Sequence, residues 1–600
     1  MCGIVGYIGP SPAQPILLDG LARLEYRGYD SAGLAVMEHG RIRTLKAAGR
    51  LENLAQQAKN APLPGSAGIG HTRWATHGEP TGRNAHPHTY AQGSIALVHN
   101  GIIENHLELR AMLEKQGCVF RSETDTEAIV HLIAHLWDGS MLSTLRKALP
   151  QLRGSYAIAL LCSHEPDALY CARKDSPLAI GLSHGQQYLA SDIPALLPHT
   201  REVELLEDGE IAILRHDGIQ VFDTAGAERP LRPMHVDWDV AAAEKDGFPH
   251  FMLKEIHEEP AALHRTLAAW SAGALPMPAE HIRGVTIVAC GTAYHAGVIG
   301  KYAIEQLARL PVTVDVASEF RYRQPILGKG DLFLAISQSG ETADTLAALR
   351  EARRLGAEVM ALTNVVGSTI AREAAPHVIY THAGPEIAVA STKAYFTQVE
   401  VLLLMAMDLA VKRGALSPEQ AAWMRAALSA LPVQAERLLE HQEIIARFAR
   451  QHCDRRHVFY IGRGVDYALA MEASLKLKEI SYIMSEAYAA GELKHGTIAL
   501  IEEGTLVCAL MTQPHLAEKT LSNIREVKAR GATVLVICCE SLRETASAVA
   551  DEVWPVPDTE PLLAPLLAAI PMQLLAYHMA VCRGCDVDKP RNLAKSVTVE

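Results

Sequence analysis

The feature that most constrains the fold is a strand–turn–helix pattern that repeats in the second half of the chain. An apolar strand at 285–289 leads through a Cys-Gly-Thr-Ala turn into a helix that runs to Leu307. A second strand at 331–336 leads through the Ser/Thr-rich turn 337–342 into another helix, and the same order returns from about residue 457. Strands that alternate with helices form parallel, doubly wound sheets, so we predict two such domains in tandem.

The first half of the chain has a different pattern. Up to about residue 237 it contains short strands separated by Gly-rich turns, with helical spacing at only two places, 51–55 and 126–133. This predicts an α/β domain with antiparallel sheets and two helices. Since 600 residues are too many for one core, we expect three or four domains.

Charge and hydropathy exclude several classes of partner. The net charge of −12 gives no reason to expect a nucleic acid or an anionic membrane. No apolar run reaches the roughly 18 residues of a membrane span, and the opening Met-Cys leaves no room for a signal peptide. Eleven scattered cysteines, an odd number, predict a reducing compartment, and we expect a cytoplasmic protein.

Two short motifs have metal-ligand spacing, but neither is complete. Cys582 and Cys585 form a C-x-x-C pair without a second pair or a nearby histidine, and Cys538-Cys539 lies in an apolar strand. We interpret His86-Pro87-His88 as a turn with solvated imidazoles. The sequence therefore predicts no metal site.

The amino terminus carries a potential nucleophile. Processing is expected to remove Met1, because cysteine is small, and to leave Cys2 with a free α-amine. The thiolate of such a residue is a nucleophile, and the amine can act as its base. The alternative is an accidental cysteine at a frayed end. The strand pattern of residues 4–9 argues against fraying.

Three polar segments of the first half have the groups that an amide substrate needs. Arg73 suits bidentate carboxylate capture. Asn100-Gly101 places a side-chain amide beside a backbone N–H, which is a plausible oxyanion hole. The segment 122–127 precedes a helix, and its polar side chains fit helix capping and ligand binding equally well.

The turn 337–342 is the strongest signal of the second half. It ends a buried strand and opens a helix, where free N–H groups and the helix dipole favour an anion. A plain N-cap is the alternative, but a cap needs only one polar residue and this turn has four. Since the chain lacks the P-loop motif, a sugar phosphate fits better than a nucleotide triphosphate. Thr292 and Ser391-Thr392-Lys393 open further helices and fit the same crevice.

Weaker signals lie near the carboxyl terminus. Glu472, Lys476 and Glu479 share one face of a helix, where exposed salt bridging is the usual explanation. His495 lies among small residues and could move protons near neutral pH. Lys595 could form a Schiff base if it is enclosed.

Taken together, these motifs resemble the glucosamine-6-phosphate synthase family, the isomerizing glutamine:fructose-6-phosphate aminotransferases, over essentially the whole chain. Four motifs resemble the glutaminase domain of amino-terminal-nucleophile amidotransferases. They are Cys2-Gly3-Ile4-Val5-Gly6, His71-Thr72-Arg73-Trp74, His99-Asn100-Gly101 and Glu123-Thr124-Asp125. Three further segments resemble paired sugar-isomerase (SIS) domains. They are 337–342, Val389-Ala390-Ser391-Thr392-Lys393 and the closing segment 588–600.

For the first half, the resemblance implies glutamine hydrolysis. Cys2 would attack the side-chain amide, with Asn100 and Gly101 stabilising the oxyanion. Arg73 would hold the substrate carboxylate and Asp125 its ammonium group. The residues expected to shape the pocket are Thr76, His77 and Gly78, and Trp74 would gate an internal path for ammonia.

For the second half, the resemblance implies isomerisation of fructose 6-phosphate. Lys595 would form an imine with C2, His495 would assist ring opening, and Glu479, supported by Lys476, would move a proton between C1 and C2. The expected sugar-phosphate ligands are Thr292, Ser337, Gln338, Ser339, Thr342, Val389 and Ser391. The family commonly has serine where this chain has Ala293, so one hydroxyl donor is lost, worth about 1 kcal/mol.

The resemblance also implies a domain plan and partners. We expect an αββα glutaminase domain at 2–237, a linker at 238–250, SIS domains at 251–440 and 441–590, and a tail at 591–600 that closes the sugar site. We expect a homodimer through the SIS domains, with glutamine and fructose 6-phosphate as substrates, no metal or cofactor, and a role in the first step of UDP-N-acetylglucosamine synthesis.

Three other functions fit the sequence less well. A deglycase or plain isomerase needs no nucleophile domain, and a sugar-phosphate sensor would carry a DNA-binding domain. A phosphoribosyl-transferring amidotransferase shares the first half but lacks two isomerase-like repeats.

Overall fold

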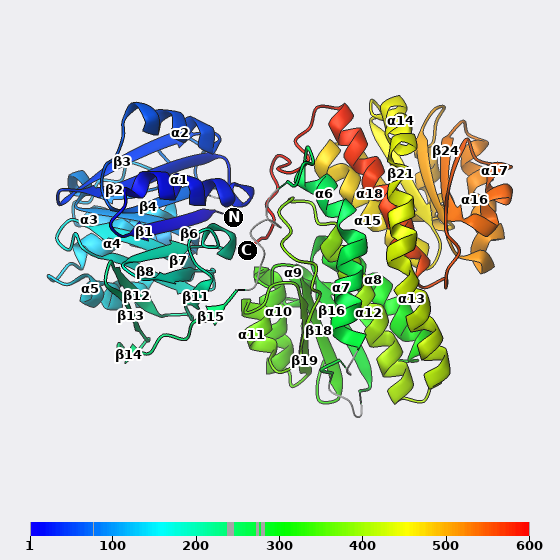
Figure 1. Ribbon diagram of the computed structural model, residues 1–600, viewed down its shortest axis with the longest axis horizontal. Helices are drawn as coiled ribbons and strands as arrows, with labels where there is room; N and C mark the ends of the chain where they lie inside the picture. Colours follow the sequence, from blue (N-terminus) through cyan, green and yellow to red (C-terminus); the bar gives the residue numbers. More distant parts are fainter. Residues whose placement is uncertain (1, 76, 237–244, 272–274, 278–281, 599–600) are drawn as a thin grey trace. The chain divides into compact units, whose positions relative to one another are not determined.

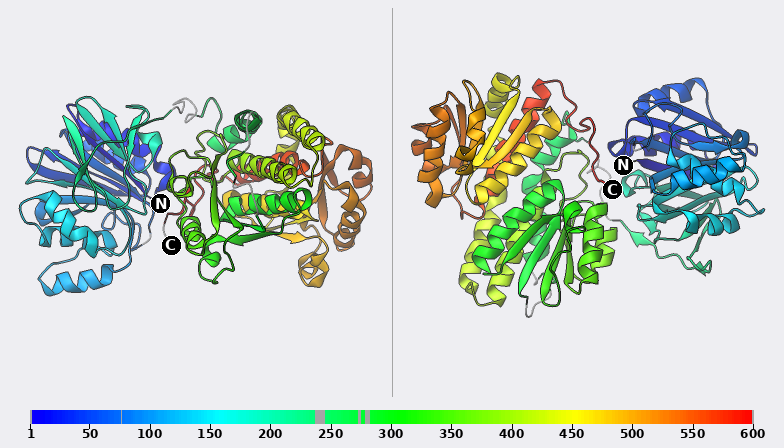
Figure 2. Two further views of the ribbon diagram at one scale, coloured as in Figure 1. Left: turned by 90° about the horizontal axis from the view of Figure 1, so that it is seen from below. Right: turned by 180° about the vertical axis from the view of Figure 1, so that it is seen from behind.

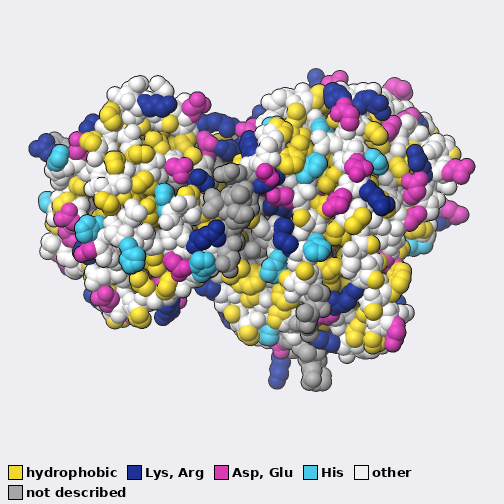
Figure 3. Space-filling model, viewed as in Figure 1, with side chains coloured by type: hydrophobic (Ala, Val, Ile, Leu, Met, Phe, Trp, Pro, Cys, Tyr) yellow, Lys and Arg dark blue, Asp and Glu magenta, His cyan; other side chains and the backbone are white. Residues whose placement is uncertain are grey.

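The computed structural model describes residues 2–75, 77–236, 245–271, 275–277 and 282–598. Contacts divide the chain into two compact units, residues 1–243 with 594–600 and residues 244–593 (Figure 1). Each unit is described by itself. On the face drawn in Figure 3, side chains of both charge signs are interspersed.

The first unit is built on two antiparallel sheets that face each other across an apolar core (Figure 1). The eight-stranded sheet has, in spatial order, β15 (Met234–His235), β11 (Glu202–Leu205), β9 (Ala179–Ser183), β10 (Gln186–Ala190), β1 (Gly3–Ile8), β4 (Ala67–Arg73), β2 (Ser31–Glu38) and β3 (Arg41–Ala48). The seven-stranded sheet has β14 (Glu228–Arg229), β13 (Gly218–Phe222), β12 (Ile211–Arg215), β8 (Leu169–Lys174), β7 (Gly154–Cys162), β6 (Ile95–Ile103) and β5 (His88–Tyr90).

Helices cover the outer face of each sheet, which gives the predicted αββα layers. The eight-stranded sheet is covered by α1 (Ala13–Arg23) and α2 (Leu51–Asn60), and the seven-stranded sheet by α3 (His106–Lys115), α4 (Asp125–His135) and α5 (Met141–Ala148). The prediction of only two helices here is wrong. Helix α1 contains Pro15 and Gly20, poor helix formers, and is stabilised by packing of Leu17 and Leu21 under β1 and β4.

The second unit contains two five-stranded parallel sheets with the same strand order, which confirms the tandem doubly wound prediction (Figure 2). The first sheet has β17 (Val312–Val316), β16 (Gly284–Ala289), β18 (Asp331–Ser337), β19 (Glu358–Thr363) and β20 (Val378–Tyr380). The second has β22 (Met484–Ala489), β21 (His457–Gly462), β23 (Leu506–Met511), β24 (Thr533–Cys539) and β25 (Glu552–Val556).

Helices pack around both sheets, and the two most apolar of them are almost fully buried. The helices of the second unit are α6 (Phe251–His257), α7 (Glu259–Ser271), α8 (Gly291–Leu307), α9 (Ala317–Phe320), α10 (Ala343–Arg354), α11 (Thr369–Ala374), α12 (Lys393–Lys412), α13 (Pro418–Leu439), α14 (Gln442–His452), α15 (Val465–Ser481), α16 (Ala517–Lys528), α17 (Arg543–Ser547) and α18 (Ala564–Cys582).

Contrary to the hydropathy prediction, α12 and α18 are long and apolar enough to cross a membrane by composition. In their most apolar windows, 89% and 83% of residues are buried inside the protein, as in core helices of a globular fold.

The cysteines differ from expectation at one place. Cys453, at the end of α14, and Cys582, at the end of α18, form a disulfide, so Cys582 is not free to act with Cys585 in a C-x-x-C site. Cys538 and Cys539 are buried in β24, as predicted.

Candidate active sites

In the first unit, Cys2 is held by the strand that follows it. Strand β1 pairs with β4 and β10 on its two sides, so the terminus is not frayed. The Trp74 backbone N–H donates to Cys2 Sγ at 3.2 Å. Burial raises the pKa of the Cys2 thiol, although the Trp74 hydrogen bond and the charge of Arg73 oppose this. The thiol therefore needs a base to become a nucleophile.

The two predicted oxyanion donors lie beside Cys2. Asn100 Nδ2 donates to the Cys2 carbonyl oxygen at 2.8 Å, although the residues are 98 positions apart. Gly101 has φ +129°, and a Cβ there would lie 2.1 Å from the Ser155 carbonyl oxygen. Only glycine fits at this position, and Gly101 lines the same small cavity as Cys2.

Arg73 is buried and engages the loop that follows it. Its guanidinium donates to the carbonyl oxygen of His77 and, at 3.2 Å each, to those of Gly78 and Glu79. A substrate carboxylate would have to replace some of these carbonyl groups. Thr76 lies outside the described residues.

A cavity of 20 Å³ brings the glutamine-site residues together. Its lining contains Cys2, Arg73, Trp74, Gly101 and Asp125 from the prediction, together with His86, His99, Thr124 and Thr126. Asp125 begins α4, and its Oδ2 accepts from the Ile103 N–H at 2.9 Å. Thr124, the N-cap residue, makes no side-chain capping bond, but Glu127 accepts from the N–H groups of Arg121 and Ser122 at 2.8 and 2.6 Å and so holds the chain that enters the helix.

The interpretation of His86-Pro87-His88 as a solvated turn is wrong. Both imidazoles are 4% exposed. His88 Nε2 lies 3.0 Å from Thr124 Oγ1, and His86 Nδ1 lies 3.1 Å from His71 Nε2. Burial lowers the pKa of both rings well below the ordinary value, so they are neutral. The segment is buried because His88 begins β5 at the edge of the seven-stranded sheet, while His86 contacts His71 on β4 of the eight-stranded sheet.

In the second unit, the turn 337–342 connects β18 to α10 as predicted. Ser337 Oγ lies 2.9 Å from Thr342 Oγ1 and accepts from the Gly340 N–H at 3.0 Å. The Glu341 N–H donates to Ser339 Oγ at 3.2 Å, and Gln338 is half-buried. Thr342 makes no side-chain capping bond to α10, so the N-cap alternative does not account for its hydroxyl.

The helix that begins after Ser391 already has an internal anion at its N-terminus. Glu386 accepts from Ser391 Oγ at 2.7 Å and from the N–H groups of Thr392 and Ala394 at 2.9 and 3.0 Å. The Val389 N–H donates to the Asp588 carbonyl oxygen at 3.0 Å. The N–H groups that could bind phosphate at α12 are therefore engaged by a carboxylate.

The Glu–Lys–Glu face of α15 is buried, so exposed salt bridging is excluded. Lys476 is 1% exposed, and its Nζ lies 2.6 Å from Glu479 and 3.5 Å from Glu472. Although burial alone would lower it, the charges of these two glutamates raise the pKa of Lys476.

Helix α8 of the first repeat completes this network. Lys476 Nζ donates to Thr292 Oγ1 at 2.9 Å, and Thr292 Oγ1 donates to Glu472 at 3.1 Å. His295 Nδ1 lies 2.7 Å from Glu472 Oε2. His295 is a member of the network that no sequence motif predicted. Its i+3 spacing from Thr292 on α8 is the signal that could have found it.

Two predicted residues lie outside helices α8 and α15. His495 lies in a 3-10 helix, Glu492–His495, and is exposed. Lys595 belongs to the segment 594–600, which groups by its contacts with the first unit. Their roles at the sugar site stay predictions.

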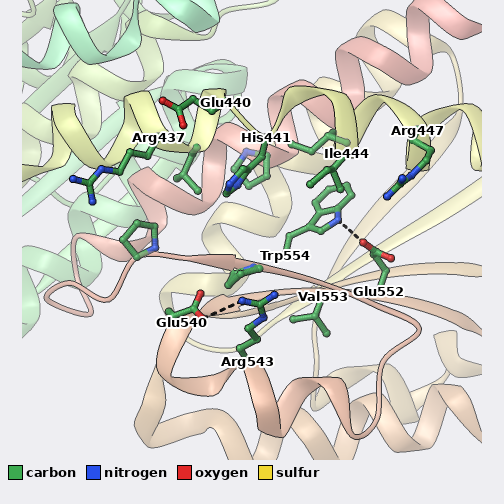
Figure 4. Close-up of a pocket in the computed structure, with 15 residues that line it drawn as sticks. Arg437, Glu440, His441, Ile444, Arg447, Glu540, Arg543, Glu552, Val553 and Trp554 are labelled. Carbon is green, nitrogen blue, oxygen red and sulfur yellow. Dashed lines mark hydrogen bonds and ion pairs between the residues drawn. The ribbon is translucent and has the colours of Figure 1, made fainter.

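A separate cavity of about 710 Å³ in the second unit contains none of the predicted residues (Figure 4). Trp554 lies in its lining and donates from Nε1 to Glu552 at 3.1 Å. Three arginines and three glutamates line it: Arg437, Arg447, Arg543, Glu440, Glu540 and Glu552. Opposite charges therefore balance in this cavity. Among the described residues, no group of three or more His, Cys, Asp or Glu side chains is placed to hold a metal ion.

Two family models match the chain. A family model described as a glutamine amidotransferase domain matches residues 71–198, and one described as the SIS domain matches residues 281–408 and 453–583.

Relatives named glutamine–fructose-6-phosphate aminotransferase (isomerizing) match over their full length. The relative from Caldanaerobacter subterraneus subsp. tengcongensis is 55% identical and that from Symbiobacterium thermophilum 56%, each with 100% of both chains covered. A solved structure, the C-terminal domain of glucosamine-fructose-6-phosphate aminotransferase from Francisella tularensis, is 38% identical with a TM-score of 0.56. The match covers 58% of this chain and 99% of that one.

Proposed function

The chain belongs to the glutamine–fructose-6-phosphate aminotransferase (isomerizing) family, and we propose that it transfers the amide nitrogen of L-glutamine to D-fructose 6-phosphate. The products are D-glucosamine 6-phosphate and L-glutamate, and this is the first step of UDP-N-acetylglucosamine synthesis. The observation that carries the proposal is the meeting of Cys2 with Asn100 and Gly101, which supplies a nucleophile beside two oxyanion donors.

In the first half-reaction, Cys2 Sγ attacks the amide carbon of glutamine and its α-amine takes the thiol proton. The oxyanion accepts from Asn100 Nδ2 and the Gly101 N–H. Ammonia leaves with a proton from the amine, and water hydrolyses the thioester to glutamate. Arg73 and Asp125 hold the substrate carboxylate and ammonium, and His77 and Gly78 shape the pocket.

In the second half-reaction, the turn residues Ser337, Gln338, Ser339 and Thr342 bind the phosphate, and Thr292, Val389 and Ser391 line the rest of the sugar-phosphate site. Lys595 forms an imine with C2, and ammonia displaces the lysine. Glu479 then moves a proton from C1 to C2 and converts the ketose imine to the aldose amine.

Ammonia released by Cys2 passes inside the protein, with Trp74 as the gate, because ammonia in water at pH 7 is mostly protonated and no longer nucleophilic. We further propose a cytoplasmic homodimer through the SIS domains, in which His495 serves the partner's sugar site. The exposure of His495 supports this proposal.

The direct test is to incubate the purified chain with glutamine and fructose 6-phosphate and to measure glucosamine 6-phosphate and glutamate. We expect both products in equal amounts. Absence of the amino sugar from a chain whose Cys2 is shown by mass spectrometry to be amino-terminal would overturn the proposed function.

A further inference from the structure

A buried histidine, His71 on β4, contacts the side chain of the proposed oxyanion donor from the opposite sheet. His71 is 0% exposed. Its Nε2 lies 3.1 Å from Asn100 Oδ1 and 3.0 Å from the His99 carbonyl oxygen. The proposed reaction gives this side chain no task, and it lies behind Asn100 rather than in the cavity lining.

The neighbours of His71 determine which ring nitrogen carries hydrogen. The His99 carbonyl oxygen can only accept, so Nε2 must be the donor, and it shares this hydrogen among His99, Asn100 Oδ1 and His86 Nδ1, which lies 3.1 Å away. Burial lowers the pKa of His71 to about 3, so the ring is neutral and Nδ1 carries no hydrogen. Consistent with this tautomer, Nδ1 has no hydrogen-bond partner among the described residues.

This donor also determines how the Asn100 amide is turned. The two ends of a carboxamide have nearly the same shape, and only their hydrogen bonds distinguish them. With the His71 N–H on Oδ1, the NH₂ group faces Cys2, where one hydrogen reaches the Cys2 carbonyl oxygen at 2.8 Å. The second hydrogen is left for a substrate oxyanion. The reversed amide would direct an oxygen at that anion.

We propose that His71 is a positioning residue that keeps the Asn100 amide turned with its NH₂ group toward Cys2. This inference rests on the proposed glutaminase reaction. In the described part of the chain, no other side chain donates to Asn100 Oδ1. The backbone of Asn100 is held separately by pairing with Ala157 of β7, so loss of His71 frees the amide without releasing the strand.

The test compares three variants by steady-state glutamine hydrolysis. His71→Leu removes the donor. His71→Gln keeps an amide N–H at about the reach of Nε2, whereas His71→Asn places it too close to the backbone. We expect His71→Leu and His71→Asn to lower kcat about 100-fold, the usual effect of losing an oxyanion donor, with KM for glutamine within about threefold. His71→Gln should stay within about tenfold of the wild type.

A double-variant cycle separates positioning from a general structural role. In an Asn100→Ala background, His71→Leu should lower kcat by less than about threefold, because His71 acts through Asn100. Additive losses, or a His71→Gln variant as impaired as His71→Asn at an equal melting temperature, would overturn the inference. A wild-type chain that hydrolyses no glutamine would instead overturn the proposed function. If His71→Leu does not fold, the Gln and Asn variants decide.

Discussion

Cys2 lies where a nucleophile is useful but its thiol is not intrinsically reactive. Burial raises the pKa of the thiol, so the thiolate is scarce at neutral pH without a base close by. A free α-amine on the same residue would supply that base, which gives the proposed removal of Met1 a chemical reason.

Replacement of the nucleophile gives the residue-scale prediction. Cys2→Ala should lower glutamine-dependent formation of glucosamine 6-phosphate more than about 1,000-fold, because no other group can form the thioester. Cys118→Ala is the matched control, since Cys118 is a free, partly exposed thiol of the same unit, and should keep full activity. Product formed from glutamine by the Cys2 variant at the normal rate would refute the assignment.

At the scale of single elements, helix α15 carries charged side chains into the interior of the second unit. It buries Glu472 and Lys476, with the partly buried Glu479 beside them, on the face that meets Thr292 of α8. Its cation neutralises two carboxylates in a region with little water, so removal of Lys476 would leave both charges uncompensated.

Lys476→Met should abolish sugar conversion and destabilise the second unit by about 3–5 kcal/mol, as expected for breaking a buried ion pair. Lys478→Met is the control, because Lys478 is exposed on the same helix. Thermal unfolding and product formation measure the two effects. Equal melting temperatures for the two variants would contradict the burial argument.

The second repeat differs from the first at the equivalent strand end. After β23, the Thr512 N–H and hydroxyl both donate to Asp466, with the N–H at 2.8 Å. An internal carboxylate thus takes the place where the first repeat has its Ser/Thr-rich turn. Burial raises the pKa of Asp466 to about 6.

This carboxylate predicts a pH dependence of stability. The folded pKa of about 6 lies above the ordinary value of 3.8, so the folded state favours the protonated acid. The contribution of Asp466 to the free energy of unfolding is full below about pH 4. It falls by about 3 kcal/mol as the pH rises through 6.

The melting temperature of Asp466→Asn minus that of the wild type should therefore be larger at pH 7.5 than at pH 4.5. Asp454→Asn, at an exposed site before β21, should show no such trend. A constant difference between Asp466→Asn and wild type at all pH values would contradict the argument.

Over the whole molecule, local sequence patterns predicted the helices and strands better than they predicted the contacts between them. The strand expected at 285–289 is β16, Gly284–Ala289, because buried parallel strands are continuous apolar runs. Helix α1 was not predicted, because its stability comes from packing against the sheet rather than from the helix propensity of its residues.

At the sites, the motifs identified Cys2, Asn100 and the 337–342 turn. No local pattern contains the contacts between distant strands and helices. These contacts determine the donor role of His71, the burial of His86 and the position of His295.

The proposed dimer predicts complementation between inactive chains. His495→Gln and Glu479→Gln should each be inactive as homodimers. A mixed dimer would contain one sugar site with both native residues, if His495 serves the partner. Co-expressed, differently tagged chains should regain about half of the wild-type activity per hybrid. Hybrids without activity would place His495 in its own chain's site.

The central claim is that nitrogen released at Cys2 is used within the same protein, and isotope transfer tests it most directly. The enzyme is supplied with glutamine labelled with ¹⁵N at the amide, fructose 6-phosphate and an excess of unlabelled ammonium. The account predicts glucosamine 6-phosphate that carries ¹⁵N almost without dilution. Product labelled in proportion to the mixed ammonium pool would contradict it.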